Sequence, residues 1–428
     1  MNCSGAEVIV VAADQRREYF WYNLACTIVS EGLWGFGSGC LGLTTVLVAF
    51  VSHLGASNMA VGLMPAAFVV GWTALRIPGA LLFRPMRARK VAFAVGHIPP
   101  LMLQFAMALV AARLGASNPR GALTWFFILA VVQSLMYGAL WSVWPHLLDR
   151  MFPPPSRGRA VGVMSAAMSA MAMVGGLYAH AVLNLDRANP PFHILFWVTG
   201  LVNTVGLIPW FIIYEAPLAQ TPPPVRVLPL LRQLFRSGSP WRGLVGARWA
   251  CEFSRAPLVF ATVLVMDRFG LPAAVTGTLT FLMNLGSGAV APLMGSIGDR
   301  FGHKTTMVVS GFALPFGTLL VSLAPHPWVA FVGFFIIGAV PTGDFMGAMN
   351  LVIEAAPEED KAVYSAIVET CMFPPRLLGP VLAGAVAQAT SAATALGLAV
   401  ALQVLSLLVT VAWVVEPRNS QTTHSGGI

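Results

Sequence analysis

Long apolar stretches separated by short polar connections make up most of this chain. A helix that crosses a membrane needs about 20 mainly apolar residues, and about twelve stretches of that length follow one another along the sequence. The pattern therefore predicts an all-α integral membrane protein. We expect its helices over residues 23–50, 58–82, 91–112, 122–147, 160–183, 193–214, 243–266, 273–296, 305–324, 328–353, 362–387 and 392–415.

The composition supports this fold class and excludes others. The 428 residues are 57% hydrophobic and 10% charged, whereas a soluble domain carries roughly 25% charged residues. A soluble globule with an ordinary surface is therefore excluded. The formal net charge of +8 is spread over short connections, so we expect the lipid bilayer, and no nucleic acid, as a partner of this chain.

One segment near the middle of the chain lacks a long apolar stretch. Residues 215–241 contain three consecutive prolines, beginning at Pro222, and several arginines. We interpret this segment as a cytoplasmic linker, with a short amphipathic helix over residues 227–235 that lies on the membrane surface. The predicted organisation is an N-terminal bundle over residues 1–214, the linker, and a C-terminal bundle with a short polar tail over residues 242–428.

The two halves of the chain repeat one another. Three pairs of landmarks recur at a separation of about 216 residues, half the length of the chain. Parallel repeats of six spans occur in membrane proteins, so we expect two pseudo-symmetric bundles of six helices. The pairs are TVLV at 45–48 and 262–265, HLGAS at 53–57 with RFGLP at 268–272, and the glycine-containing basic segments Gly79–Lys90 and Gly295–Lys304.

Basic residues are distributed unevenly between the two sides of the predicted membrane. The connections on one side carry only Arg113, Arg120, Arg187 and Arg268, while the termini and the other connections carry most of the 25 Lys and Arg residues. Short loops rich in Lys and Arg stay in the cytoplasm. We therefore expect a multi-pass protein of the cell inner membrane with both termini in the cytoplasm.

The most distinctive polar stretch is PLMGSIGDRFGHK at residues 292–304, which joins two apolar stretches. Glycine allows the backbone to turn sharply, and an aspartate at the start of a helix favours the positive end of its dipole. Basic residues hold a connection in the cytoplasm. We predict a short loop in which Asp299 caps the following helix.

This stretch resembles the signature loop of the major facilitator superfamily of secondary transporters. The usual motif ends Gly-Arg-Lys, and His303 stands here in place of the arginine. In the first half Phe83 stands at the position of the aspartate, so a latch that holds one conformation should depend on Asp299 alone. The resemblance implies two six-helix bundles and a gating loop formed by Gly295, Asp299, Arg300, Gly302 and Lys304.

Charged residues also fall within the predicted spans, where they are costly and usually face a partner or a cavity. Arg248, Glu252 and Arg255 are spaced i, i+4 and i+7, which places them on one face of a helix. Glu369 and Arg376 are seven residues apart and also share a face. Two interpretations stay open for both groups: structural ion pairs between helices, or a polar wall of a central cavity.

In the family that the loop resembles, spans 1, 4, 7 and 10 line most of the central cavity. Three acids, Glu31, Glu252 and Asp344, fall at a similar depth in such spans, on the order of 15 Å from the cytoplasmic ends at roughly 1.5 Å per residue. The resemblance implies a substrate and ion pathway formed by Glu31, Gln133, Tyr137, Trp141, Arg248, Glu252, Arg255 and Asp344.

Asp344 is the acid that we expect to carry a proton, with Glu31 as the second candidate. It lies in VPTGDFMG at residues 340–347, where proline and glycine weaken the helix, and no base lies within one turn of it. The rival interpretation is a purely structural pair between Asp344 and Arg248.

The predicted function is secondary active transport of a small molecule by alternating access, coupled to protons. Export of amphipathic or anionic compounds is favoured, because aromatic residues suit amphipathic solutes and buried arginines suit anions. The alternatives are an uptake symporter for a small organic anion and a non-transporting sensor or scaffold on the same fold. An enzyme is not expected, since no set of nucleophile and base falls at mid-span.

No cofactor or metal is expected, and the chain is expected to be a monomer. The sequence has no GxxxxGK[ST] loop for a nucleotide. His97 and His180 lack the spacing of metal ligands.

Overall fold

The computed structural model describes residues 15–83, 86, 89–216, 229, 232, 235–236, 239–356 and 361–416. These residues form helices and contain no strand, which confirms the predicted all-α fold class. The amphipathic helix expected over residues 227–235 lies largely outside the described residues, and the tail after residue 416 lies wholly outside them.

The chain folds into two compact units. The first takes residues 1–42 and 67–224, and the second takes residues 43–66 and 225–428. The stretch 43–66 therefore belongs to the second unit, although it precedes the predicted linker. The boundaries of the two predicted bundles stay predictions.

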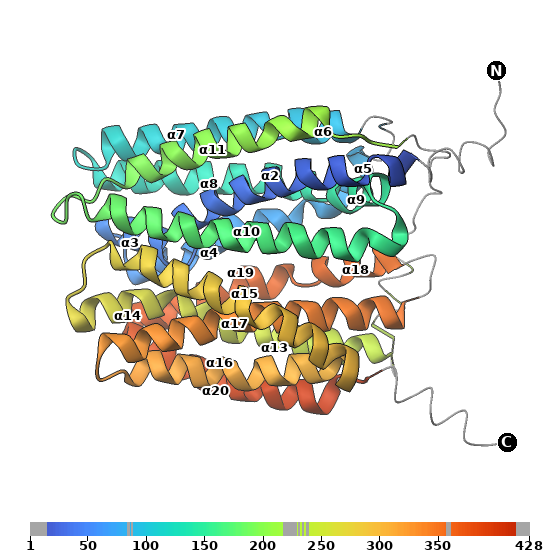
Figure 1. Ribbon diagram of the computed structural model, residues 1–428. Helices are drawn as coiled ribbons and strands as arrows, with labels where there is room; N and C mark the ends of the chain where they lie inside the picture. Colours follow the sequence, from blue (N-terminus) through green and yellow to red (C-terminus); the bar gives the residue numbers. More distant parts are fainter. Residues whose placement is uncertain are drawn as a thin grey trace. The chain divides into compact units, whose positions relative to one another are not determined.

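The first unit is built from helices that run alongside one another (Figure 1). In this unit α2 packs against α10 and α11, and α7 packs against α8 and α11. Its helices are α2 (Phe20–Cys40), α5 (Arg76–Phe83), α6 (Arg89–Gly96), α7 (Ile98–Leu114), α8 (Pro119–Trp141), α9 (Trp144–Met151), α10 (Pro154–Leu183) and α11 (Phe192–Ile212), while α4 (Asn58–Ala74) contributes residues to both units.

Glycines bring α2 and α10 close together. A Cβ atom added at Gly35 would meet the backbone carbonyl of Met168, and one added at Gly39 would meet that of Ala172. Small residues at such contacts allow helix backbones to approach each other in a membrane. This contact fixes the position of α2, which carries Glu31.

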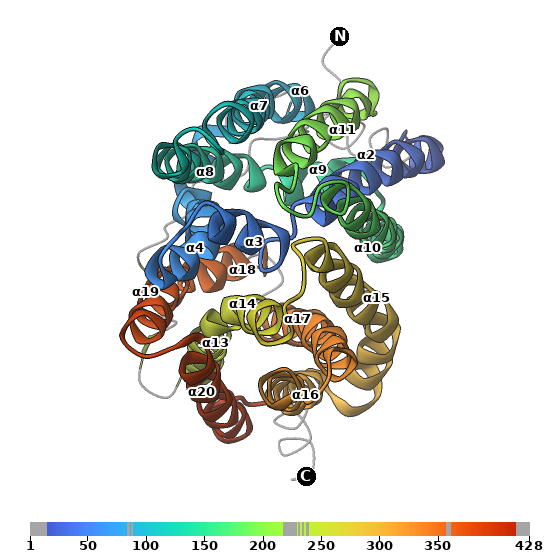
Figure 2. The ribbon, with the colours of Figure 1, turned by 90° about the vertical axis from the view of Figure 1, so that its left-hand side faces the viewer.

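In the second unit α13 packs against α19 and α20, α16 packs against α17 and α20, and α15 packs against α17. Figure 2 views these helices along their lengths. The helices of this unit are α3 (Val46–His53), α13 (Pro240–Arg255), the short η1 (Ala256–Leu258), α14 (Val259–Phe269), α15 (Val275–Phe301), α16 (His303–Leu323), α17 (Pro327–Ala355), α18 (Lys361–Thr370), α19 (Phe373–Ala389) and α20 (Ala392–Trp413).

Within the described residues, eleven helical segments are long and apolar enough to cross a membrane, and α2 is not one of them. The prediction of one continuous helix over residues 23–50 is wrong, because the chain is broken between Cys40 and Val46 into α2 and α3. A glycine-rich run before this break lowers the helix propensity. The chain is nevertheless a multi-pass membrane protein.

Proline marks another break, which positions charged residues in the second unit. α18 ends at Thr370, and α19 begins at Phe373 with prolines in its first turn. Proline is tolerated there because the first N–H groups of a helix have no partner within it. The Cys371 carbonyl at this break accepts a hydrogen bond from the indole of Trp249 at 2.7 Å. Glu369 and Arg376 thereby lie near two adjoining helix ends.

Candidate functional site

A cluster of charged side chains lies buried in the second unit. Arg248 of α13 is 2% exposed, and Asp344 of α17 is 4% exposed. Arg248 Nη1 lies 2.9 Å from Asp344 Oδ2, and Arg248 Nη2 lies 3.1 Å from Glu369 Oε1. Glu252 Oε1, one turn along α13, is 3.8 Å from the same Nη2. One guanidinium group therefore faces three carboxylates.

Two further arginines complete this charged cluster. Arg376 Nη2 lies 2.8 Å from Glu252 Oε1, and Arg376 Nη1 lies 3.1 Å from Glu369 Oε2. Arg255 Nη1, at the end of α13, lies 3.3 Å from Asp344 Oδ2. The formal charges of the three arginines and three acids cancel. The one helix face predicted for Arg248, Glu252 and Arg255 is the face that enters the cluster.

The charged cluster is expected to add little to the stability of the protein, and it is more informative as a candidate functional site. A buried ion pair contributes little net stability, because both charges lose their hydration, but removal of one partner is costly. Charges inside spanning helices tend to mark substrate or ion paths. The charged cluster is therefore the leading candidate for a substrate or ion site in this chain.

Asp344 lies in a different environment from the one that its own helix suggests. The sequence shows no base near it on α17, but Arg248 and Arg255 of α13 both reach its Oδ2 atom. The ion pair of Asp344 with Arg248 that the rival interpretation expects is present at 2.9 Å, whereas its purely structural role stays a prediction. Spacing along one helix does not reveal a partner on another helix, which is why the second arginine was missed.

Glu31 lies in the first unit, on α2, and is partly buried. Within the described residues, no hydrogen bond or ion pair reaches its carboxylate. Glu252 and Asp344 belong to the second unit, so the expected common depth of the three acids stays a prediction.

Gln133 of α8 is buried and bonded within the first unit. Its Nε2 donates to Pro100 O at 2.8 Å and to Gln104 Oε1 at 3.2 Å, both on α7. The side chain thus ties α8 to α7.

The other predicted pathway residues on α8 are aromatic. The ring of Tyr137 packs against Trp34 and His97, with centroid distances of 5.8 and 5.6 Å. Trp141 is 46% exposed and stacks on Trp72, which is 45% exposed. The predicted pathway residues Tyr137 and Trp141 therefore offer flat apolar rings, whereas those of α13 and α17 are charged.

The stretch 292–304 is mostly helical, so the expected short loop is wrong, whereas the gating role of its residues stays a prediction. α15 continues through Gly295, Asp299 and Arg300 to Phe301, and α16 begins after Gly302 alone. Gly302 has φ of 91°, a conformation that side chains other than glycine rarely adopt. Asp299 lies in the last turn of α15, and Gly302 stands at the N-cap of α16. The Arg300 guanidinium lies 5.3 Å from the centroid of the Phe301 ring.

The carboxylate at the start of α16 comes from the far end of the chain. Glu416, after α20, accepts a hydrogen bond from the Lys304 backbone N–H at 2.8 Å. The Lys304 Nζ donates to Val411 O at 2.7 Å. A negative group stabilises the positive end of a helix, so Glu416 does what was expected of Asp299.

The first unit repeats this arrangement. Glu215, after α11, accepts hydrogen bonds from the backbone N–H groups of Arg89 and Lys90 at 3.2 and 3.0 Å. The Lys90 Nζ donates to Ile213 O at 2.8 Å, and Glu215 also forms an ion pair with Arg150. The sequence reasoning missed both acids. The sequence feature that could have indicated them is the occurrence of the similar segments YEAP and VVEP, which contain Glu215 and Glu416, at the ends of the sixth and twelfth apolar stretches.

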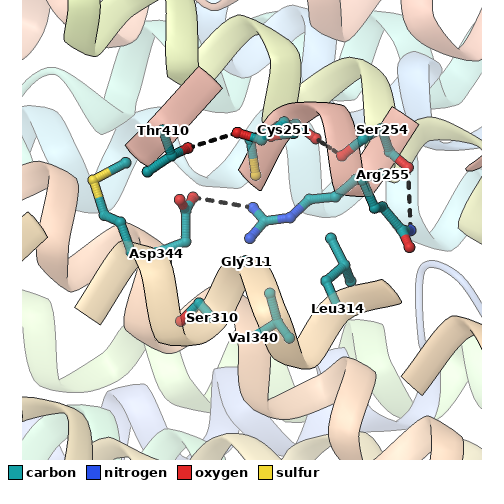
Figure 3. Close-up of a pocket in the computed structure, with 12 residues that line it drawn as sticks. Cys251, Ser254, Arg255, Ser310, Gly311, Leu314, Val340, Asp344 and Thr410 are labelled. Carbon is teal, nitrogen blue, oxygen red and sulfur yellow. Dashed lines mark hydrogen bonds and ion pairs between the residues drawn. The ribbon is translucent and has the colours of Figure 1, made fainter. Parts of the chain in front are cut away.

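A small pocket adjoins the charged cluster in the second unit. It has room for about one water molecule and is lined by residues of α13, α16, α17 and α20. Figure 3 shows the side chain of Arg255 extending toward Asp344 at this pocket. Within the described residues, no group of three or more His, Cys, Asp and Glu side chains is arranged to hold a metal ion.

The sequence matches known transporters. The model of the Major Facilitator Superfamily matches residues 27–264 and 244–427, which is nearly the whole chain. A segment of 111 residues is 27% identical to the MFS-type transporter TOXA of Cochliobolus carbonum. That segment is 26% of this chain and spans only 20% of the length of TOXA.

The fold is similar to those of solved transporters. A mutant of the nucleoside transporter NupG has a TM-score of 0.70 at 12% identity, over 91% of this chain and 99% of that chain. A D-xylose-proton symporter has a TM-score of 0.69 at 14% identity, over 93% and 98%. The human organic anion transporter MFSD10 has a TM-score of 0.61 at 14% identity, over 90% and 98%. These likenesses show the fold, and together with the family match they establish that the chain belongs to the Major Facilitator Superfamily and is a membrane transporter, not an enzyme.

Proposed function

We propose that this chain is a secondary active transporter that moves a small anionic molecule by alternating access and couples this movement to protons. The charged cluster in the second unit is the observation that carries the proposal. Arginine offers a fixed fork of N–H donors that suits carboxylate and phosphate groups. One buried and two partly buried arginines in spanning helices therefore favour an anionic substrate.

Asp344 offers a way to link the substrate to a proton. Its carboxylate faces Arg248 at 2.9 Å and Arg255 at 3.3 Å. A proton on Asp344 removes the negative charge between these guanidinium groups and leaves them to bind an anion. Loss of the proton restores the ion pairs and displaces the anion. Binding of the proton and binding of the anion then favour each other, and this coupling is reciprocal.

Glu31 is the second candidate for the proton site. Its carboxylate has no hydrogen bond or ion pair to another described residue. A proton on Glu31 therefore breaks no ion pair, and the coupling would have to act through a conformational change.

Transport by Asp344→Asn and Glu31→Gln in proteoliposomes separates these candidates. With a panel of labelled small carboxylates, we expect Asp344→Asn to exchange substrate across the membrane but not to accumulate it when a pH gradient is imposed. Glu31→Gln should still accumulate it. Accumulation driven by pH in Asp344→Asn would contradict the assignment and make Glu31 the next residue to test.

Two directions of transport have support. Export of amphipathic or anionic compounds is supported by the exposed stacked pair Trp72 and Trp141. Uptake of a small organic anion with a proton is supported by the neutral charged cluster, because an anion alone would leave it with a buried net charge. The solved neighbours are named as transporters of nucleosides, of a sugar with protons, and of organic anions, and so favour neither direction. Liposomes with a pH gradient of each sign would show which direction accumulates the substrate.

We propose in addition that the segment containing Gly295, Asp299, Arg300, Gly302 and Lys304 gates the transporter, with Asp299 as the latch. The orientation in the membrane is a separate part of the proposal: both termini lie in the cytoplasm. The protein is a monomer of the cell inner membrane. The excess of Lys and Arg in the termini and even-numbered connections supports the cytoplasmic position of the termini. A reporter fused to the C-terminus should be active in the cytoplasm, and an external signal would contradict it.

A further inference from the structure

A row of buried polar side chains leads along α16 toward Asp344. His303, Thr306 and Ser310 are spaced i, i+3 and i+7, which places them on one face of this helix. Each of the three residues is buried, with an exposed fraction of 6% or less. Polar and ionisable side chains inside a spanning helix are costly and tend to mark ion paths. This face of α16 is therefore a candidate for a function that the charged cluster alone does not explain.

Glycines of α17 lie against the polar face of α16. A Cβ atom added at Gly347 would be 2.4 Å from Thr306 Oγ1, and one added at Gly343 would be 2.2 Å from Ser310 Oγ. The two hydroxyl groups therefore lie directly against the backbone of α17. Because Gly343 precedes Asp344 in the chain, the polar face ends beside the acid that is proposed above to carry a proton.

The small pocket lies where the polar face meets Asp344 (Figure 3). Ser310 and Asp344 both line this pocket, which has room for about one water molecule. A buried water needs two to four polar partners. Nε and Nη2 of Arg255 and Oε1 of Gln403 are buried and have no hydrogen-bond partner among the described residues. The pocket therefore suits one water molecule, which can connect Ser310 to Asp344.

The other end of the polar face, at His303, reaches the surface through Glu354 of α17. His303 Nε2 lies 3.4 Å from Glu354 Oε1, and the Glu354 side chain is 27% exposed. Histidine is the side chain that ordinarily gains and loses a proton between pH 5 and 8. Arginine, which stands at this position in the motif that the segment resembles, keeps its charge throughout that range. Histidine therefore gives this chain a group that can pass a proton on.

We propose that His303, Thr306 and Ser310 form a proton path between the cytoplasmic end of the second unit and Asp344. His303 takes up a proton on the side of Glu354 and releases one toward Thr306. Each hydroxyl group accepts a proton on its oxygen and releases its own, and the water in the pocket delivers one to the Asp344 carboxylate. The path rests on the proton site and the orientation proposed above.

The steps along the path are longer than one hydrogen bond. Neighbouring groups on one face of a helix have Cβ atoms about 5–6 Å apart. One water molecule spans such a gap between two polar groups. The Thr306 hydroxyl donates to His303 O at 2.7 Å, so it must rotate before it can donate toward Ser310. A proton therefore moves only when a hydroxyl rotates or a water enters, which keeps the path closed for most of the time.

Charged groups surround both ends of the path, whereas hydroxyl groups form its middle. Those near His303 are Asp299 and Arg300 in the last turn of α15, Lys304 of α16, Glu354 of α17 and Glu416 after α20. The titratable and charged groups around Asp344 are Arg248, Cys251, Glu252 and Arg255 of α13, Glu369 of α18 and Arg376 of α19. Because Thr306 and Ser310 do not titrate, the two ends determine where the proton rests.

Transport in proteoliposomes separates a proton path from a structural role. The substrate is the labelled small carboxylate that the wild type accumulates. Exchange of this carboxylate at equal pH on both sides requires no proton to leave Asp344, whereas accumulation driven by a pH gradient requires one in each cycle. A variant of the path should therefore slow accumulation and leave exchange unchanged. Damage to the fold should lower both rates.

Three variants test the path. His303→Gln should slow the initial rate of accumulation roughly 100-fold or more, the contribution of a positioned acid–base group. His303→Arg keeps a positive charge beside Glu354 but cannot release a proton, so it should be as slow as His303→Gln. Thr306→Val keeps the shape of the side chain but removes one hydroxyl group, and should slow accumulation roughly 2- to 12-fold, the equivalent of one hydrogen bond.

The matched control is Thr318→Val on the same helix. Thr318 is buried, and its hydroxyl donates to Leu314 O at 2.9 Å, as the Thr306 hydroxyl donates to His303 O. It lies beyond Ser310 along α16 and outside the pocket lining. Thr318→Val should therefore match the wild type in both accumulation and exchange.

The proposal is overturned if Asp344→Asn loses accumulation while His303→Gln and Thr306→Val accumulate the carboxylate at the wild-type rate. It is also overturned if His303→Arg accumulates normally and His303→Gln does not, because that result assigns His303 to its ion pair with Glu354. A wild type that accumulates no carboxylate under a pH gradient of either sign would instead refute the proton coupling proposed above, and the path with it.

Discussion

The cores of the two units are built from different chemistry. In the first unit Trp210 donates through Nε1 to Ser30 Oγ at 2.7 Å and packs against Phe93 and Trp144, with centroids 4.7 and 5.2 Å away. In the second unit Arg248 takes the central place and faces three carboxylates. The surroundings of Trp210 are neutral and aromatic, and those of Arg248 are charged and formally balanced.

At their helix ends, by contrast, the two units agree. Glu215 binds the backbone at the start of α6, and Glu416 binds the backbone at the start of α16. The ammonium group of Lys90 donates to a carbonyl at the end of α11, and that of Lys304 donates to a carbonyl near the end of α20. The internal repeat is therefore a repeat of the backbone and its caps, whereas the cluster of three arginines and three acids belongs to the second unit.

Removal of Arg248 should have the largest effect on stability. Arg248→Leu removes one of the two arginine partners of Asp344 and of Glu369 and leaves the charged cluster with a net negative charge, and breaking a buried pair in this way costs about 3–5 kcal/mol. Trp210→Phe in the first unit keeps an aromatic ring and loses one neutral hydrogen bond and some volume, at about 1–2 kcal/mol. Thermal unfolding of the purified variants, followed by size-exclusion chromatography, measures the difference.

The double variant Arg248→Leu with Asp344→Asn is the control for charge. It removes one charge of each sign, so it should recover part of the stability that Arg248→Leu loses. If Trp210→Phe were the more damaging change, the contrast between a charged and a neutral core would be wrong.

The two caps should differ in strength by a smaller amount. Glu215 binds backbone donors and also pairs with the buried Arg150, so Glu215→Gln should cost about 1.5–3 kcal/mol. Glu416 binds the Lys304 N–H through Oε2, and its Oε1 is buried with no partner among the described residues. Glu416→Gln should therefore cost only about 0.3–1 kcal/mol. Equal shifts in melting temperature would show that the Arg150 ion pair adds nothing to the first cap.

Two glycines of the segment 292–304 give a further comparison. Gly302 has φ of 91°, and a Cβ atom there would lie 2.6 Å from Glu416 Oε2, so Gly302→Ala should cost about 1–2 kcal/mol. Gly295 is helical, and a Cβ atom there would have only the Met346 methyl group near it, at 3.9 Å. Gly295→Ala should be neutral or stabilise by up to about 1 kcal/mol. Melting curves that rank these variants the other way would mean that the bend at Gly302 does not serve the cap.

The sequence by itself determined the fold class and most of the helices. The expected helix over residues 160–183 is α10 (Pro154–Leu183), and that over 328–353 is α17 (Pro327–Ala355). Helix formation by an apolar stretch of about 20 residues does not depend on the rest of the chain, because its backbone groups must be satisfied within the segment when it lies in lipid. The shared face of Arg248, Glu252 and Arg255 was likewise a local property, because it follows from helix periodicity.

Only the tertiary structure decided which charges meet. Arg248 and Asp344 are 96 residues apart in sequence, and Lys304 and Glu416 are 112 apart. Apolar patterning fixes where a helix lies in the membrane but not which neighbour it packs against, and an ion pair depends on that packing over a few ångströms. For this reason the sequence showed Asp344 without a base beside it and assigned the cap of α16 to Asp299, while the folded chain supplies two arginines from α13 and a glutamate from beyond α20.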